Sequence, residues 1–312
     1  MPSRRRRPNI AVAIPAKNEQ RAIGSIVSMC SEHADKVLVV NDGSTDKTAL
    51  VALLAGAEVM SHRINKGKGA AIATALKWAM KKDVDILVFI DGDGQHDPDA
   101  IPDLVDPIFR GETDITIGSR WHHEEGLREM PIHRMLGNWV LSTATSFSLS
   151  KVIRDSQSGF RAFHKRTFPV FMQSVEVGFA VESEMIALAD KAGYHWKEVG
   201  IKASYVNLDA NTEGSLYHGL SVLGRAMKVM RIQQPGRFFG VLSITSFLMV
   251  IGMALYGRTA HPEEKLLPLY LLYFIAFFII TGGFFMFSAI IVSGMNRTSE
   301  RIFRLMISIL RR

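Results

Sequence analysis

Two long stretches without a charged residue, 238–257 and 266–295, constrain the fold of this chain more than any other feature. A helix needs about 20 predominantly apolar residues to cross the hydrocarbon core of a bilayer, and both stretches reach that length. The alternative is a pair of buried helices in a soluble core, where uncharged runs of this length are rare. We therefore expect two membrane-spanning helices within residues 238–295, the second of them long enough to tilt or kink.

Positive charge gathers at both ends of the chain. The formal net charge is +7, four arginines occupy positions 4–7, and five arginines lie within residues 296–312. Such clusters favour an anionic surface, either lipid headgroups or nucleic acid. Next to two membrane spans we expect headgroups rather than nucleic acid. The excess of Arg and Lys outside the spans predicts a multi-pass protein whose N-terminal domain and both termini face the cytoplasm.

Residues 9 to about 205 alternate short apolar runs with stretches of helical pattern. Strands that alternate with helices are typical of α/β proteins, so we expect a Rossmann-like, mostly parallel sheet covered by helices. The predicted strands are 10–14, 37–40, 58–60, 86–90 and 115–117. The predicted helices are 21–30, 48–55, 68–82 and 101–110.

The residues Asp91, Gly92, Asp93, Gly94 and Gln95 directly follow the fourth predicted strand. Carboxylate oxygens at the end of a buried strand suit Mg²⁺ or Mn²⁺, and Mg²⁺ sites commonly combine one or two carboxylates with substrate phosphates. Ordinary turn chemistry is the alternative, because Asp and Gly both accept the backbone angles of a turn. Polar clusters also follow the first two predicted strands, and ligands of α/β sheets bind at the carboxyl ends of strands.

The composition divides the chain into five segments. Apolar residues recur at helical spacing between 216 and 230 with basic residues on another face, which predicts an amphipathic helix in the membrane interface. A helix packed on the preceding domain is the alternative. The predicted segments are a basic tail 1–8, an α/β domain 9–212, the interfacial helix 213–237, two transmembrane helices 238–295 and a basic amphipathic C-terminal helix 296–312.

Five short motifs follow one another along the α/β domain: VAIPAKNE at 12–19, VVNDGSTD at 39–46, NKGKG at 65–69, DGD at 91–93 and GSR at 118–120. As an ordered set they resemble the family-two glycosyltransferases with the A-type nucleotide-sugar fold. Within that family the chain is similar to the dolichyl-phosphate mannose and polyprenyl-phosphate hexose synthases, over residues 9 to about 205. The resemblance implies a metal-dependent enzyme with a nucleotide sugar as its donor.

The resemblance also implies roles for individual residues. Asp93 and Gln95, with Asp91, would hold Mg²⁺ or Mn²⁺ against the donor diphosphate, and Asp93 would thereby be catalytic. Residues 65–69 are suited to bind an anion at a helix start, or to form a plain turn. The nucleotide sugar would be bound by Asp91 and Gly92 together with residues that follow the first two strands, namely Pro15, Lys17, Glu19, Val40 and Asp42.

A lipid phosphate acceptor would change what the enzyme must supply. The second pKa of a phosphate monoester is about 6, so the acceptor is already anionic near neutral pH and can attack without a general base. The protein must instead gather cations around it, and arginine suits bidentate phosphate binding. We expect Arg120 and Arg134 to bind the acceptor phosphate and to be catalytic, with Arg161 and Lys165 next. A surface salt bridge is the alternative for Arg134 and for Arg161.

The expected function is metal-dependent, inverting transfer of a hexose from GDP-mannose or a UDP-hexose to dolichyl or polyprenyl phosphate at the cytoplasmic membrane face, with homo-oligomerisation left open. Residues 209–216 lack the basic residues that mannose-phosphate relatives often carry there, which shifts weight to other hexoses. One alternative is a membrane polysaccharide synthase with a hydroxyl acceptor, since Gln234, Arg237 and Phe238 partly match the Gln-x-x-Arg-Trp element of such enzymes. A non-enzymatic membrane scaffold is the second alternative.

Overall fold

The structure is a computed structural model that describes residues 7–122, 132–146, 149–172, 181–202, 235–260 and 266–310. It divides into two compact units, Met1–Leu223 and Gly224–Arg312, and each unit is described by itself. The predicted interfacial helix at 213–237 lies almost wholly outside the described residues, as do residues 209–216 and most of the tail 1–8. For Arg134 the backbone lies inside a described helix, but the side chain is outside the described set.

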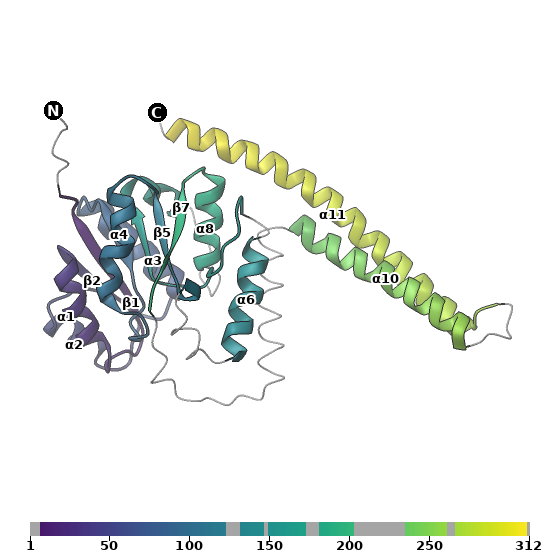
Figure 1. The fold of residues 1–312 in the computed structure, drawn as a ribbon, viewed down its shortest axis with the longest axis horizontal. Helices are drawn as coiled ribbons and strands as arrows, with labels where there is room; N and C mark the ends of the chain where they lie inside the picture. The colour runs from purple at the N-terminus through teal and green to yellow at the C-terminus, as the bar shows by residue number, and fades with distance from the viewer. Residues whose placement is uncertain are drawn as a thin grey trace. The chain divides into compact units, whose positions relative to one another are not determined.

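A seven-stranded sheet forms the centre of the first unit (Figure 1). Its strand order is β3-β2-β1-β4-β6-β5-β7, and β6 runs antiparallel to both of its neighbours while the other pairs are parallel. The sheet is therefore mostly parallel, as the sequence predicts. The strands are β1 (Ile10–Ala16), β2 (Lys36–Asp42), β3 (Glu58–His62), β4 (Ile86–Phe89), β5 (Ile115–Ser119), β6 (Arg161–His164) and β7 (Trp196–Gly200).

The five predicted strands are all present, with ends that differ by no more than two residues from the prediction. The sequence pattern does not reveal β7, because Lys197 and Glu198 interrupt its apolar residues and only Trp196 at its start is buried. β7 nevertheless forms, since it pairs in parallel with β5 along its whole length. This pairing joins residues far apart in the chain, so local pattern carries no signal for it.

Helices cover both faces of the sheet, and all four predicted helices are present. Successive side chains of a strand point to opposite faces. In β1, Val12 and Ile14 belong to the apolar cluster with α1 and α4, whereas Ala11 and Ala13 belong to the cluster with α3 and α8. The helices are α1 (Ile23–His33), α2 (Thr48–Leu54), α3 (Lys68–Lys81), α4 (Ile101–Phe109), α6 (Ile132–Ser146), α7 (Phe168–Phe171) and α8 (Val181–Lys191), with short 3-10 turns η1 (Pro98–Ala100), η2 (Arg120–His122) and η3 (Lys165–Thr167).

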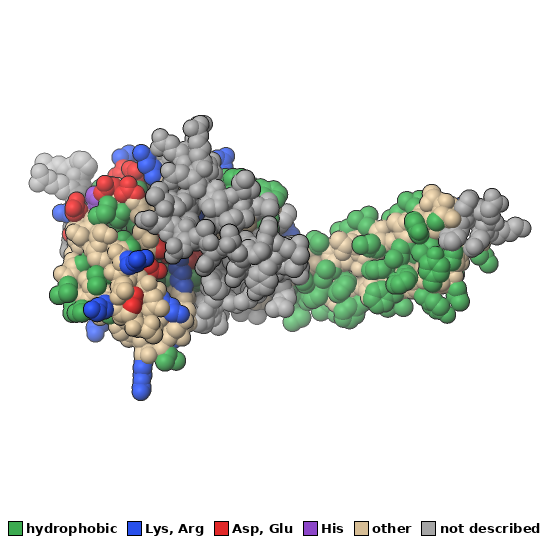
Figure 2. Space-filling view, turned by 90° about the horizontal axis from the view of Figure 1, so that it is seen from below, with side chains coloured by type: hydrophobic (Ala, Val, Ile, Leu, Met, Phe, Trp, Pro, Cys, Tyr) green, Lys and Arg blue, Asp and Glu red, His purple; other side chains and the backbone are tan. Residues whose placement is uncertain are grey.

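Two long apolar helices, α10 (Pro235–Ala260) and α11 (Leu269–Leu310), form the described part of the second unit. They pack closely at small residues: the Ser243 hydroxyl donates to the Gly282 carbonyl at 2.9 Å. In Figure 2 many hydrophobic side chains (green) are visible on the surface of this pair, with backbone and polar side chains (tan) between them. Pro235–Ala260 and Leu269–Met295 are long and apolar enough to cross a membrane, and only 11% and 6% of their most apolar windows are buried. Such exposure argues against the soluble-core alternative.

The helix α11 continues without a break from the second predicted span into the basic C-terminal segment. The sequence predicts a separate helix over 296–312, so the structure joins two segments that were expected to be distinct. The physical reason is that no proline follows Pro268, and without a proline the backbone hydrogen bonds of the helix are not interrupted. The backbone at Gly282 and Gly283 is helical like the rest of α11.

Candidate active site

A cavity of about 660 Å³ opens at the carboxyl edge of β1, β2 and β4. Most of the residues predicted to bind a nucleotide sugar and a metal line this one cavity. Val40 does not: its side chain is completely buried in the core on the α3 face, so the expected ligand contact of this side chain is wrong. The lining residues are Pro15, Ala16, Lys17, Glu19, Asp42, Asn65, Gly67, Lys68, Ala71, Asp91, Gly92, Asp93, Gln157 and Glu182.

The Asp42 carboxylate, at the end of β2, organises the loop that leads into α3. Its Oδ1 accepts a hydrogen bond from the Lys66 N–H at 2.9 Å and lies 2.7 Å from His62 Nδ1, and its Oδ2 accepts from the Gly67 N–H at 2.7 Å. Burial opposes ionisation, but these hydrogen bonds outweigh it and hold the pKa of Asp42 below its usual value. Asp42 therefore shapes the cavity wall as well as lining it.

Lys68 lies in the first turn of α3 between two carboxylates. Its Nζ is 2.6 Å from Asp91 Oδ1 and 2.7 Å from Glu182 Oε1. Burial disfavours the ammonium ion, but the charges of Glu182 and Asp91 outweigh burial and raise the pKa of Lys68 above its usual value. A fixed positive charge thus stands at a helix start, where anions are already favoured. The sequence pattern identifies residues 65–69 as a possible anion site. It does not reveal the contact between Lys68 and Glu182, because Glu182 lies far away along the chain.

Asp93 is the exposed carboxylate of the cavity wall. Its Oδ1 accepts a hydrogen bond from the Gln95 N–H at 3.0 Å, whereas the Gln95 side chain does not line the cavity. Burial, followed by the charges of Asp93, Asp46 and Asp91, raises the pKa of Glu19 to about 7. A divalent cation would relieve this crowding of negative charge.

The donor set fits Mg²⁺ or Mn²⁺ only together with substrate oxygens. Across the described parts of the chain, no three acidic, histidine or cysteine side chains are grouped closely enough to hold a metal by themselves. Mg²⁺ commonly takes one or two carboxylates and completes its shell with water and phosphate oxygens. Asp93 offers such a carboxylate at the cavity, while Asp91 is already paired with Lys68.

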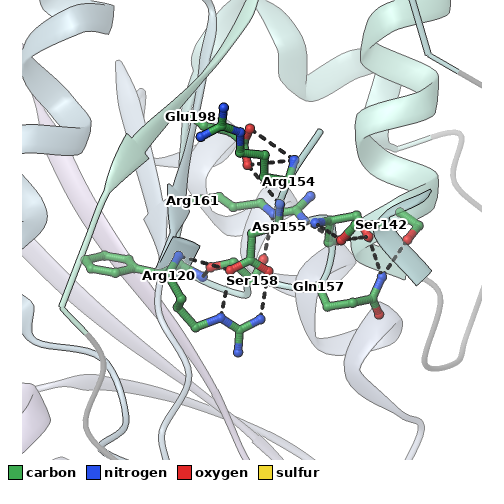
Figure 3. Close-up of polar contacts among 11 residues, drawn as sticks. Arg120, Ser142, Arg154, Asp155, Gln157, Ser158, Arg161 and Glu198 are labelled. Carbon is green, nitrogen blue, oxygen red and sulfur yellow. Dashed lines mark hydrogen bonds and ion pairs between the residues drawn. The ribbon is translucent and has the colours of Figure 1, made fainter. Parts of the chain in front are cut away.

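Arg120 and Asp155 form a bidentate ion pair (Figure 3). The Nε and Nη2 atoms of Arg120 each donate to a different carboxylate oxygen at 2.7 Å, and its backbone N–H adds a third hydrogen bond at 3.1 Å. Asp155 is completely buried. Burial opposes its ionisation, but the charge of Arg120 and the hydrogen bonds outweigh it and keep the pKa of Asp155 low. Asp155 therefore holds the Arg120 guanidinium in one orientation at the end of β5.

Arg161 does not occupy the phosphate-binding position expected from the sequence. Arg161 is only 2% exposed. Its three guanidinium nitrogens donate at 2.7 Å to the main-chain carbonyls of Ser158, Glu182 and Ser156. All of its donor nitrogens are therefore engaged by the main chain. Arg161 joins the loop before β6 to the first turn of α8. This role is structural, but a buried arginine bonded to carbonyls is not the surface salt bridge that was the alternative.

Lys165 lies at the opposite edge of the sheet from the cavity, so its expected role is also wrong. Because β6 is antiparallel to β4, Arg161 pairs with the end of β4 and His164 pairs with its start. Lys165 comes next and forms an ion pair with Asp85 at 2.7 Å. Strand residues advance by about 3.3 Å each, so roughly 13 Å separate the two edges along β6.

Comparisons with known proteins agree with this architecture. The family profile described as "Glycosyl transferase family 2" matches residues 11–170. The chain is 32% identical over 233 residues to UDP-N-acetylglucosamine–dolichyl-phosphate N-acetylglucosaminyltransferase of Methanococcus voltae, covering 69% of this chain and 90% of that protein. It is 31% identical over 200 residues to polyprenol monophosphomannose synthase of Mycolicibacterium smegmatis, covering 61% of this chain and 75% of that protein.

A solved structure shows the same fold. Glucosyl-3-phosphoglycerate synthase of Mycobacterium tuberculosis, in complex with Mn²⁺, UDP and phosphoglyceric acid, matches with a TM-score of 0.54 and 22% sequence identity. The match covers 72% of this chain and 78% of that one. The A-type fold expected from the motifs is thereby confirmed.

Proposed function

The chain belongs to glycosyl transferase family 2, and from that premise we propose that it transfers one hexose from a nucleotide-diphosphate sugar to the phosphate of a polyprenyl or dolichyl phosphate. The observation that carries the proposal is a cavity lined by Lys68, Asp91 and Asp93, in a chain that also has two helices long enough to cross a membrane. The names of the two relatives add support, since one includes a dolichyl phosphate and the other a polyprenol monophosphomannose.

The nucleotide half of the donor would lie where β1 and β2 end, against Pro15, Lys17 and Asp42. Its diphosphate would then reach the first turn of α3, where Lys68 and the helix start both favour negative charge. The named relatives differ in the sugar they carry. We therefore keep both GDP-mannose and a UDP-hexose as candidate donors.

Asp93 is the residue that we assign to a bound Mg²⁺ or Mn²⁺, with Asp91 and Gln95 as further candidates. Bound there, the cation would neutralise the charge that builds on the diphosphate as it leaves. Lys68 supports this arrangement because its contact with Asp91 keeps that carboxylate ionised and oriented. The same contact keeps a second positive charge beside the leaving group.

The acceptor phosphate would attack the anomeric carbon directly and invert its configuration. No general base is needed, since the nucleophile is already anionic near neutral pH. We assign Arg120, oriented by Asp155, to the acceptor phosphate, and Arg134 on α6 as its second cation. The apolar helices would keep the enzyme at the membrane that holds its acceptor, with the active site on the cytoplasmic side.

The test is transfer by the full chain in lipid nanodiscs. The protein is incubated with Mn²⁺, with dolichyl phosphate or undecaprenyl phosphate, and with labelled GDP-mannose, UDP-glucose or UDP-N-acetylglucosamine. We expect a labelled lipid-linked sugar from at least one donor, and loss of product when Mn²⁺ and Mg²⁺ are removed. Transfer to a free saccharide, with no lipid-linked product, would refute the proposal and favour the polysaccharide-synthase alternative.

A pair of carboxylate variants tests the metal assignment within the same assay. Asp93→Ala should abolish both turnover and metal-dependent donor binding. Asp106→Ala is the matched control, because Asp106 is an exposed carboxylate on α4 whose partner is Arg110, one turn further along the helix. The control should behave like the unmodified protein, and an Asp93→Ala variant with full activity would remove Asp93 from the metal site.

A further inference from the structure

Gln157 is a cavity residue that the sequence motifs did not single out for a role. It lies in the segment just before β6 and lines the cavity together with Glu182. Its side chain is partly buried, and the side-chain nitrogen Nε2 lies 2.8 Å from the hydroxyls of both Ser156 and Ser183. Figure 3 shows the carboxamide oxygen of Gln157 pointing away from these contacts.

The hydroxyl groups around Gln157 determine which way its carboxamide faces. The Thr145 hydroxyl lies 2.8 Å from the Leu141 carbonyl and donates to Ser183 Oγ at 3.0 Å. The Ser183 and Ser156 hydroxyl oxygens each accept a hydrogen bond from Gln157 Nε2 at 2.8 Å. The NH₂ group of Gln157 is therefore turned toward these two serines. The oxygen is the polar atom that remains for the cavity.

The strand order indicates which part of a donor would meet this oxygen. β4 lies between β1 and β6, so Gln157, just before β6, is on the other side of the Asp91 to Asp93 turn from β1 and β2. With the nucleoside beside β1 and β2 and the diphosphate at that turn, the hexose falls on the β6 side. Glu182 lies there as well, with its Oε1 held by Lys68 at 2.7 Å.

We propose that Gln157 is a specificity-determining residue whose side-chain oxygen accepts a hydrogen bond from one hydroxyl of the transferred hexose. The inference rests on the proposed function, because it needs a nucleotide hexose in the cavity. The serine contacts hold the oxygen in place before the sugar arrives, so little side-chain entropy is lost on binding. A sugar without a hydroxyl at that position leaves the oxygen unpaired, and such an unpaired group is the basis of strong discrimination.

The test pairs protein variants with donor analogues. Once the donor panel has identified the preferred nucleotide hexose, kcat/KM is measured for that donor and for its 2-, 3-, 4- and 6-deoxy analogues. The unmodified protein should lose about ten-fold or more on one analogue relative to the parent sugar. In Gln157→Leu that same analogue and the parent sugar should react at nearly equal rates, while the other analogues keep their wild-type ratios.

Two further variants separate sugar recognition from folding. Ser183→Ala removes one group that orients Gln157 and should weaken the same single preference to a smaller extent. Ser150→Ala is its control, because Ser150 is an exposed residue bonded to Asp190 away from the cavity residues. Binding of the free nucleoside diphosphate should be unchanged in all three variants, since Gln157 meets only the sugar.

The outcomes distinguish the inference from the function on which it rests. If the unmodified protein turns over no nucleotide hexose, the proposed function fails and the inference fails with it. If turnover occurs but Gln157→Leu shifts all four analogue ratios equally, or none of them, the role of Gln157 is refuted and the transfer reaction stands. If Gln157→Leu does not fold, Ser183→Ala with the same analogues decides, and unchanged ratios overturn the inference.

Discussion

The guanidinium of Arg161 provides the sharpest test of how this active site is built. In the variant Arg161→Met, three main-chain carbonyls lose a charged donor, those of Ser156, Ser158 and Glu182. A hydrogen bond to a charged group contributes about 1.5–3 kcal/mol. Removing the buried cation also removes its desolvation cost of several kcal/mol, which offsets part of the lost hydrogen-bond energy. The net loss in the free energy of unfolding should therefore resemble that of breaking a buried ion pair, about 3–5 kcal/mol.

Thermal unfolding of the full chain in detergent measures this loss. In domains of this size each kcal/mol lowers Tm by about 2–4 °C, so Arg161→Met should unfold roughly 6–20 °C earlier. The matched control is Arg110→Met, which breaks only an exposed pair with Asp106 worth about 0.3–0.5 kcal/mol. An Arg161→Met variant that unfolds like the control but binds acceptor phosphate poorly would contradict the structural role and restore the phosphate-binding one.

Three further outcomes are expected. Lys68→Met should weaken nucleotide-sugar binding at least about ten-fold in calorimetry, since it removes the fixed charge at the helix start; unchanged affinity would exclude Lys68 from the donor site. The pKa of Glu19 is about 7 when folded against 4.5 when unfolded, so the folded state binds more protons between these values and metal-free stability should fall as pH rises through that window. In Glu19→Gln, the free energy of unfolding measured in urea should no longer fall as pH rises through that window. A pH profile identical to that of the unmodified protein would refute this role of Glu19. Gly43→Ala should destabilise more than Gly56→Ala in urea unfolding: both glycines have positive φ, but a Cβ on Gly43 meets backbone at 2.5 Å whereas Gly56 is open. Equal losses of stability in the two glycine variants would contradict this expectation.

Much of the fold and part of the site could be predicted from local pattern. The predicted strands and helices of the α/β domain are present, and the polar residues after β1, β2 and β4 line one cavity. They meet because parallel strands bring their carboxyl ends to the same edge of a sheet. Motif and strand together were therefore enough to place Asp42, Asp91 and Asp93 near one another.

The wrong expectations for Arg161 and Lys165 share one physical cause, which is the direction of β6. Sequence pattern does not reveal that this strand is antiparallel to its neighbours. The residues that precede β6, including Gln157, therefore lie at the cavity, and Lys165 after β6 lies at the far edge. Arg161 at the start of β6 is buried, and carbonyls from two separate segments take up its donors.

The sequence by itself determined what neighbouring residues decide: which segments form strands or helices, which helices are apolar enough for a membrane, and which carboxylates end a strand. Only the tertiary structure decided which charges are already paired and which polar atoms remain for a ligand. Lys68 is bridged to Glu182, and the NH₂ group of Gln157 is turned toward Ser183. Those contacts join residues far apart in the chain, and local periodicity carries no record of them.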